Sequence, residues 1–124
     1  MAFKIKPFYP LNTTPIYRTL DTDGVLGVAN KNGTIRIHKD VTDPAQLQEV
    51  IDHEMVHRDQ MNPESNDTGR FAYDNYNMYY KPKGSKKTIV TKRSNKVDGA
   101  PYLGHEKEAN DKKTQQKIKR KYNG

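Results

Sequence analysis

The 124-residue chain contains no cysteine, so neither a disulfide nor a cysteine-ligated metal site can form within it. Tryptophan is also absent, and only 32% of the residues are hydrophobic. A chain of this length suits one domain, but so few apolar side chains predict a small core. We therefore expect a single domain over residues 1–124, parts of which are either solvated loops or are held by a metal or a partner.

Long hydrophobic runs are missing as well. The first ten residues contain two lysines but no apolar stretch of the length that a signal peptide needs. No segment has the length and apolarity of a membrane span. These absences predict a cytoplasmic protein with no membrane partner.

Charge is unevenly distributed along the chain, whose net charge is +7. Residues 39–67 contain eight acidic and two basic residues, whereas residues 81–96 contain seven basic residues and no acid. This pattern favours an acidic functional region with basic flanks, which could bind nucleic acid or an acidic protein surface. The basic runs lack the interleaved aromatics of a nucleic-acid platform, so solvated lysine is the simpler interpretation.

The two ends and the middle of the chain show little periodicity. Prolines favour an extended arm within residues 1–20. Residues 62–101 are polar and rich in tyrosine and lysine, which predicts a loop region, although KTIVTKR within it has the composition of a short strand. Residues 112–124 form a basic tail, in which Ile118 is the one strongly apolar residue. We expect this tail to project into solvent or onto a partner.

A β-hairpin is predicted before residue 40. Asn32-Gly33 favours a tight turn, and β-type segments flank it at residues 25–30 and 34–38. The two isoleucines of the second segment, Ile35 and Ile37, should face one way and Arg36 and His38 the other.

A helix should follow the hairpin. Asp43 is a favoured N-cap, Pro44 suits the first helical position, and apolar residues then recur at helical spacing. Pro63 disfavours helix at the residue before it, so the helix should end near Met61. The sequence HEMVH, residues 53–57, lies in the middle of this helix.

HEMVH has the spacing of a metal site. His53 and His57 are one helical turn apart, so both imidazoles can reach one ion, and Zn²⁺ is the expected cofactor. Glu54, as a general base, would take a proton from a water molecule that the metal activates. The alternative is a helix with two surface histidines and a solvated glutamate.

A catalytic zinc usually has three protein ligands. The extension HExxHxxGxxH is excluded, because Gln60 and Pro63 occupy the required glycine and histidine positions. A second helix, predicted to begin near Gly104, offers Glu106, and Asn110 one turn later could hydrogen-bond a ligand histidine. The competing ligands on this segment are His105, Glu108 and Asp111.

HExxH followed by ExxA and then Asp or Asn resembles the gluzincin metallopeptidases. The resemblance implies a minimal zincin-like α+β domain, in which a small antiparallel sheet packs on the HExxH helix and a second, C-terminal helix completes the site. It implies that His53, His57 and Glu106 bind zinc and that Glu54 is the catalytic base. Asn110 stands where many relatives have Asp.

The resemblance also implies hydrolysis of a peptide or protein substrate, bound in extended form along an edge strand. GTIRIHKD, residues 33–40, is expected to be that edge. Peptide hydrolysis further needs a donor that stabilises the oxyanion. The candidates are His105, Tyr102, Tyr73 and Tyr76.

A broader pattern, HExVHRDQM followed by tyrosine-rich and Glu-Lys-Glu-Ala segments, resembles small zincin-like proteins encoded by bacteriophages. It implies a virion-associated protein with phage structural proteins as partners. An alternative function is therefore a structural or assembly protein on a zincin scaffold, with little or no catalysis. A lesser alternative is a nucleic-acid-associated basic protein.

Overall fold

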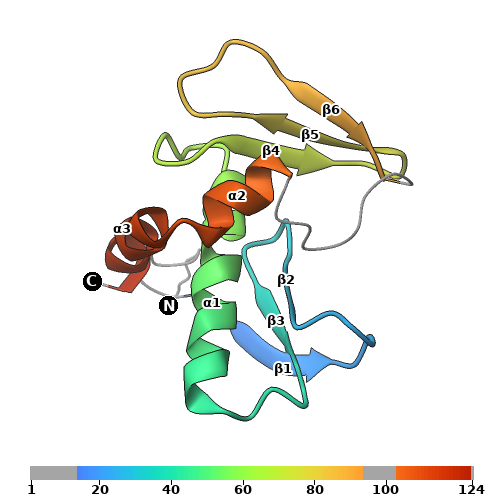
Figure 1. Cartoon of the computed structure of the whole chain (residues 1–124), viewed down its shortest axis with the longest axis vertical. Helices are drawn as coiled ribbons and strands as arrows, with labels where there is room; N and C mark the ends of the chain where they lie inside the picture. Colours follow the sequence, from blue (N-terminus) through green and yellow to red (C-terminus); the bar gives the residue numbers. More distant parts are fainter. Residues whose placement is uncertain (1–13, 94–102, 124) are drawn as a thin grey trace, which may run out of the picture.

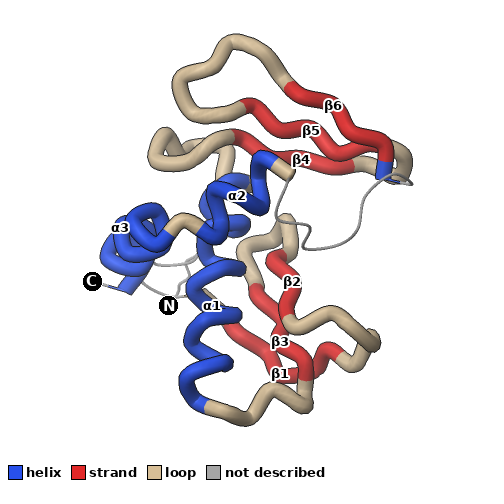
Figure 2. The backbone as a smooth tube through the Cα atoms, viewed as in Figure 1, coloured by secondary structure: helices blue, strands red, loops and turns tan. Residues whose placement is uncertain are grey.

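The computed structural model describes residues 14–93 and 103–123. These residues form the α+β fold that the sequence predicts, with six strands and three helices. The first three strands lie beside helix α1, the last three strands form a separate sheet, and the two C-terminal helices pack next to α1 (Figures 1 and 2). Most of the predicted N-terminal arm, residues 1–13, lies outside the described residues.

The predicted hairpin is present. β2 (Gly27–Ala29) and β3 (Ile35–His38) pair in antiparallel fashion. Gly33 in the turn has a φ of +87°, a conformation that glycine adopts without strain. Both isoleucines of β3 have no exposed surface, so they face the same way, as their alternation predicts.

β3 is not the edge strand that the sequence analysis predicts. β1 (Ile16–Leu20) pairs with β3 in parallel, so the strand order β1-β3-β2 places β3 in the centre of this first sheet. Ile16–Leu20 was expected to belong to the extended arm. Its pairing joins segments that are distant in the sequence, which local patterns cannot show. The two edge strands of this sheet are β1 and β2.

Helix α1 (Pro44–Gln60) has the predicted bounds. The Asp43 carboxylate accepts the N–H of Gln46 at 3.0 Å and so caps its first turn. The first sheet packs on one side of α1 and the C-terminal helices pack on another. The buried core contains Ala29, Ile35, Ile37, Val41, Val50, Met55, Val56, Ala109, Ile118 and Tyr122.

Much of the region predicted to be a polar loop is a second sheet. β4 (Arg70–Tyr73), β5 (Asn77–Lys81) and β6 (Ile89–Lys92) form it in that order, with antiparallel pairing. β6 confirms the short strand predicted for KTIVTKR. On β5 two buried side chains alternate with less buried ones, so a largely polar segment still supplies one buried face.

α2 (Gly104–Asn110) begins where a second helix was predicted, but the chain bends at Asp111 before α3 (Lys112–Asn123) begins. The Asp111 carboxylate accepts the N–H and the hydroxyl of Thr114, at 2.9 and 2.7 Å, and therefore caps α3. No helix in the described part of the chain has the length and apolarity needed to cross a membrane.

α3 corrects the expectation of a projecting basic tail. Ile118 and Tyr122, one turn apart on α3, have no exposed surface and belong to the core. The basic residues of α3 lie mostly on its other side and are exposed. The helix therefore lies against α1, as Figure 1 shows.

Asp59 of α1 explains why α3 docks. Its carboxylate is fully buried and accepts hydrogen bonds from Tyr122 Oη at 2.6 Å and Lys121 Nζ at 2.7 Å. Ser65 and Thr68 donate their hydroxyls to its other oxygen, at 2.5 and 2.7 Å. Burial alone would raise the pKa of Asp59, but these four hydrogen bonds outweigh burial and hold its pKa below the usual value.

Acid should weaken this docking. Because the native pKa of Asp59 is depressed, its contribution to stability is present above the unfolded pKa of about 3.9 and is lost as pH falls through the native pKa. Asp59→Asn should lower the free energy of unfolding at neutral pH by about 3 kcal/mol and flatten its pH dependence. Denaturant unfolding at a series of pH values measures both effects.

Asp67→Asn is the matched control. Asp67 accepts a hydrogen bond from the same Lys121 at 2.8 Å, but its side chain is 36% exposed. Its replacement should cost much less because water screens the charge. Equal losses in the two variants would contradict the assignment of α3 docking to Asp59.

Candidate metal centre

α1 places two histidines on one face. The Nε2 atoms of His53 and His57 are 3.1 Å apart, and the ring centroids are 4.7 Å apart. His57 is buried and His53 is partly exposed. This arrangement follows from the helix bounds, because residues i and i+4 are neighbours on a helix.

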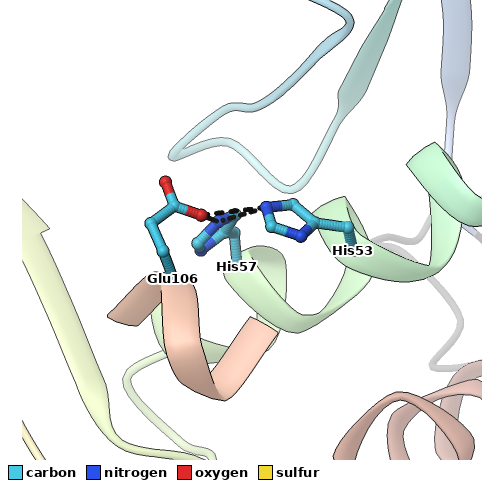
Figure 3. Close-up of side chains that lie close together, drawn as sticks. All are labelled: His53, His57 and Glu106. Atoms are coloured by element: carbon cyan, nitrogen blue, oxygen red, sulfur yellow. Dashed lines mark hydrogen bonds and ion pairs between the residues drawn. The ribbon is translucent and has the colours of Figure 1, made fainter. Parts of the chain in front are cut away.

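Glu106 reaches both histidines from α2. Its Oε1 lies 2.9 Å from Nε2 of His53 and 2.8 Å from Nε2 of His57 (Figure 3). The fully buried Ala109, a small residue, lies on the same helix, which packs closely on α1. One ligand atom from each of the three residues lies within 4.8 Å of the others. We refer to His53, His57 and Glu106 as the triad.

Asn110 contacts His53, as expected from its place one turn after Glu106. Its Oδ1 lies 2.9 Å from Nδ1 of His53. An amide oxygen only accepts hydrogen bonds, so His53 carries its proton on Nδ1. The lone pair of its Nε2 is then directed at Glu106.

Gln60 supports the second histidine, and the sequence analysis missed this role. Its Oε1 lies 2.8 Å from Nδ1 of His57. The amide orientation is fixed, because Nε2 of Gln60 donates to the carbonyl oxygen of His105 at 3.0 Å and to Oε1 of Glu108 at 2.8 Å. Its position three residues after His57 on a predicted helix was a usable signal.

The triad fits a metal ion. Two imidazole lone pairs and one carboxylate oxygen point at the same small volume, separated by 2.8–3.1 Å. Three acceptors at such distances repel one another unless positive charge lies between them. Two nitrogens and one oxygen are also a ligand set common in metal sites of proteins. These residues could therefore hold a metal ion.

The pKa shifts agree with a centre that attracts positive charge. Burial alone would raise the pKa of Glu106, but its close contacts with His53 and His57, when these imidazoles are charged, hold it well below the usual value. Burial opposes the charged form of His57, yet the carboxylates of Glu106 and Glu54 outweigh it and raise the pKa of His57. Each shift favours a positive charge beside Glu106, carried by a proton or by a metal ion.

Glu54 is buried under β2. A Cβ atom placed on Gly27 would lie 3.0 Å from Cγ and 3.3 Å from Oε2 of Glu54, and 2.7 Å from Cγ1 of Val50. The strand can pass this close only because Gly27 has no side chain. Burial raises the pKa of Glu54, and the charges of His57 and His53 oppose that shift.

A cleft of about 450 Å³ opens onto the triad and Glu54. One wall is formed by residues 24–29, which include β2. The second sheet provides the facing wall, and α1 and α2 contribute the polar residues between them. From the second sheet, Phe71, Tyr73 and Met78 line the cleft, and so does Arg93, which directly follows β6.

His105 lies in this cleft, next to the third triad residue. Its ring stacks on that of Phe71, with centroids 4.3 Å apart, and its Nε2 is 3.8 Å from Oε2 of Glu106. Of the tyrosines considered with it, Tyr73 lines the cleft, whereas Tyr76 is 78% exposed and lies away from it. Tyr102 lies outside the described residues.

Glu108 and Asp111, the other competing ligands, have different contacts. Glu108 accepts the hydrogen bond from Gln60, the N–H of Gly69 at 3.0 Å and the hydroxyl of Tyr80 at 3.2 Å. Glu108 therefore links Gln60, which hydrogen-bonds His57, to the second sheet. Asp111 caps α3 and is exposed.

Comparison with known proteins identifies no relative: no family model, curated protein or solved structure matches this chain. A motif as short as HExxH has too few residues to establish a family by itself. Conclusions about function consequently depend on the triad, Glu54 and the cleft.

Metal affinity should depend on the residues that orient the two histidines, and zinc serves as the probe metal. Asn110→Ala and Gln60→Met remove the acceptors of the two Nδ1–H groups, and each should weaken zinc binding by about 10- to 100-fold. Glu106→Ala removes a ligand and should weaken binding further. Competition with a chromophoric chelator measures the dissociation constants, and metal analysis should give about one ion per chain.

Gln48→Met is the control for Gln60→Met. Gln48 lies on the same helix, but it is exposed and its amide donates to Asp52 at 2.7 Å. This variant should bind zinc like the wild type. If folded Asn110→Ala and Gln60→Met variants also matched the wild type, neither residue would orient a ligand.

Proposed function

We propose that the protein is a zinc-dependent metallopeptidase. The observation that carries this proposal is the convergence of His53, His57 and Glu106 beside the buried Glu54, at one cleft. A metal centre that opens onto a cleft suits chemistry on a bound molecule, whereas a structural zinc is usually enclosed by four protein ligands.

Zinc is the metal that the ligand set favours. A zinc ion held by two neutral imidazoles and one carboxylate would have three protein ligands, which leaves room for a water or substrate atom. When bound, a zinc ion supplies Lewis acidity, which polarises a substrate carbonyl and makes water more acidic. The fixed Nδ1–H tautomers of His53 and His57 prepare both Nε2 atoms for this ion.

Glu54 is the proposed proton carrier. Glu54 directly follows His53 in the sequence, and its side chain is buried and lines the cleft. It accepts a proton from the attacking water while oxygen bonds to the peptide carbon, and it donates a proton to the amine as the carbon–nitrogen bond breaks. Water is added across the peptide bond, and no covalent bond to the protein forms.

β2 is the proposed docking edge for an extended peptide. It is an edge strand of the first sheet and borders the cleft. A peptide that pairs with this edge would lie beside Glu54, because Gly27 of β2 is in near contact with that side chain. β2 thus takes the role that the sequence analysis gave to residues 33–40.

The oxyanion of the reaction also requires a donor. Among the candidates from the sequence, His105 has the best placement, because its Nε2 lies in the cleft 3.8 Å from the Glu106 carboxylate. Tyr73 lines the same cleft from the second sheet and is the remaining candidate within the described part of the chain.

Glu54→Gln tests the proposed chemistry. It should retain zinc but cleave peptides about 10²- to 10⁴-fold more slowly, because an amide cannot carry the proton. Mass spectrometry of peptide mixtures made from denatured proteins measures cleavage, with metal analysis on the same samples. Chelation of zinc should abolish cleavage in the wild type, and added zinc should restore it.

Glu49→Gln is the matched control, since it removes the same charge from an exposed position on the same helix. It should cleave as fast as the wild type. Zinc-loaded wild-type protein that cleaves no peptide, or a Glu54→Gln variant of full activity, would refute the proposed mechanism.

Gly27→Ala should separate metal binding from catalysis. The added Cβ would meet Val50 and Glu54 at 2.7 and 3.0 Å, so β2 or the glutamate must shift. We expect zinc affinity to remain and the cleavage rate to fall by about 10- to 100-fold, since a small misplacement of a catalytic group has a large effect. Unchanged cleavage in this variant would show that the close approach is unimportant.

A further inference from the structure

A row of aromatic rings leads along the cleft wall to two cations. The ring of Phe71 lies 6.3 Å from that of His57, and Tyr73 lies 6.1 Å from Phe71. The Arg93 guanidinium is 5.2 Å from the centre of the Tyr73 ring, and Lys31 Nζ is 4.1 Å from it. The wall is therefore apolar beside the triad and positively charged at the Tyr73 end.

Within the described residues, the Arg93 guanidinium contacts a backbone oxygen and an aromatic ring and not a carboxylate. One of its terminal nitrogens donates to the backbone oxygen of Asp74 at 2.8 Å. The Asp74 carboxylate instead accepts the N–H groups of Tyr76 and Asn77 and the hydroxyl of Tyr79. Among the described residues, no carboxylate lies within the 4.0 Å ion-pair distance of the Arg93 guanidinium.

The spacing of this wall matches an extended peptide. Side chains on one face of a strand repeat about every 6.6 Å. Phe71 and Tyr73, two residues apart on β4, repeat at 6.1 Å. A peptide whose extended backbone runs along this row would present every second side chain to the wall, so one side chain could pack on Phe71 while the next on the same face reaches Arg93.

We infer that the cleft selects peptides with an apolar side chain beside the triad and a carboxylate about two residues away, and that Arg93 determines this selectivity. The inference rests on the proposed function, because it assumes that a peptide occupies the cleft. The carboxylate belongs either to an Asp or Glu side chain or to the end of a peptide. Both sources present the same charge and the same two oxygens to a guanidinium.

Peptide binding to the zinc-loaded Glu54→Gln variant tests the inference without requiring cleavage. The probes are acetylated, amidated, alanine-based peptides that carry Leu and, two residues away in either direction, Asp or Asn. Calorimetry should show that one Asp peptide binds about tenfold more tightly than its Asn counterpart. Arg93→Gln should remove this ratio, and Arg93→Lys should retain part of it.

Lys92→Gln is the matched control. Lys92 precedes Arg93 in the chain and carries the same charge, but it is exposed and does not line the cleft. This variant should keep the preference for Asp. A further pair of peptides, which end two residues after Leu as a free acid or as an amide, distinguishes a terminal carboxylate from a side chain.

Equal binding of all Asp and Asn pairs and of the acid and amide pair would overturn the inference, as would failure of every peptide to bind. A preference that survives Arg93→Gln, or that disappears equally in Lys92→Gln, would also overturn the assignment to Arg93. Cleavage of the same peptides by the wild type is measured separately. Selective binding without cleavage would therefore refute the peptidase proposal and leave the selectivity intact.

Discussion

Helix α1 buries four polar side chains near its C-terminal end, and each requires a partner from another part of the chain. An unpaired polar group in such a position costs roughly 1–3 kcal/mol, and an unpaired charge costs more. Glu54 lies under β2, His57 contacts the carboxylate of α2, Asp59 binds α3, and Gln60 bonds to α2. These requirements determine where β2, α2 and α3 can lie, and hence the shape of the candidate site.

The same polar contacts compensate for a small apolar core. Apolar burial is not directional, so the few hydrophobic side chains of this chain could pack in several arrangements. Hydrogen bonds from Lys121 and Tyr122 to Asp59 select one arrangement for α3. The bonds from Gly69 and Tyr80 to Glu108 likewise fix the second sheet relative to α2. Specific polar contacts thus supply the uniqueness that a larger core would otherwise provide.

Local signals in the sequence were enough to predict the hairpin, the bounds of α1 and the two histidines of the triad. Each of these depends on near neighbours: a turn at Gly33, a cap at Asp43, or ligands one helical turn apart. The pairing of β1 with β3, the second sheet and the docking of α3 were not predicted. They depend on contacts between distant segments, such as that of Asp59 with Tyr122, 63 residues away. A polar residue gives no local sign that it will be buried, although the position of Gln60, three residues after His57, indicated which histidine it could contact.

The separation of the triad along the chain has a consequence for synthesis on the ribosome. Glu106 lies 49 residues after His57, and Asn110 lies 57 residues after His53. A nascent chain that has not yet extended to α2 holds two histidines but lacks the third ligand and the acceptor that orients His53. Domains assemble as their segments emerge, so the complete centre forms only after α2 has been made. A chain without α2 has two of the three ligands and therefore cannot form the candidate metal centre.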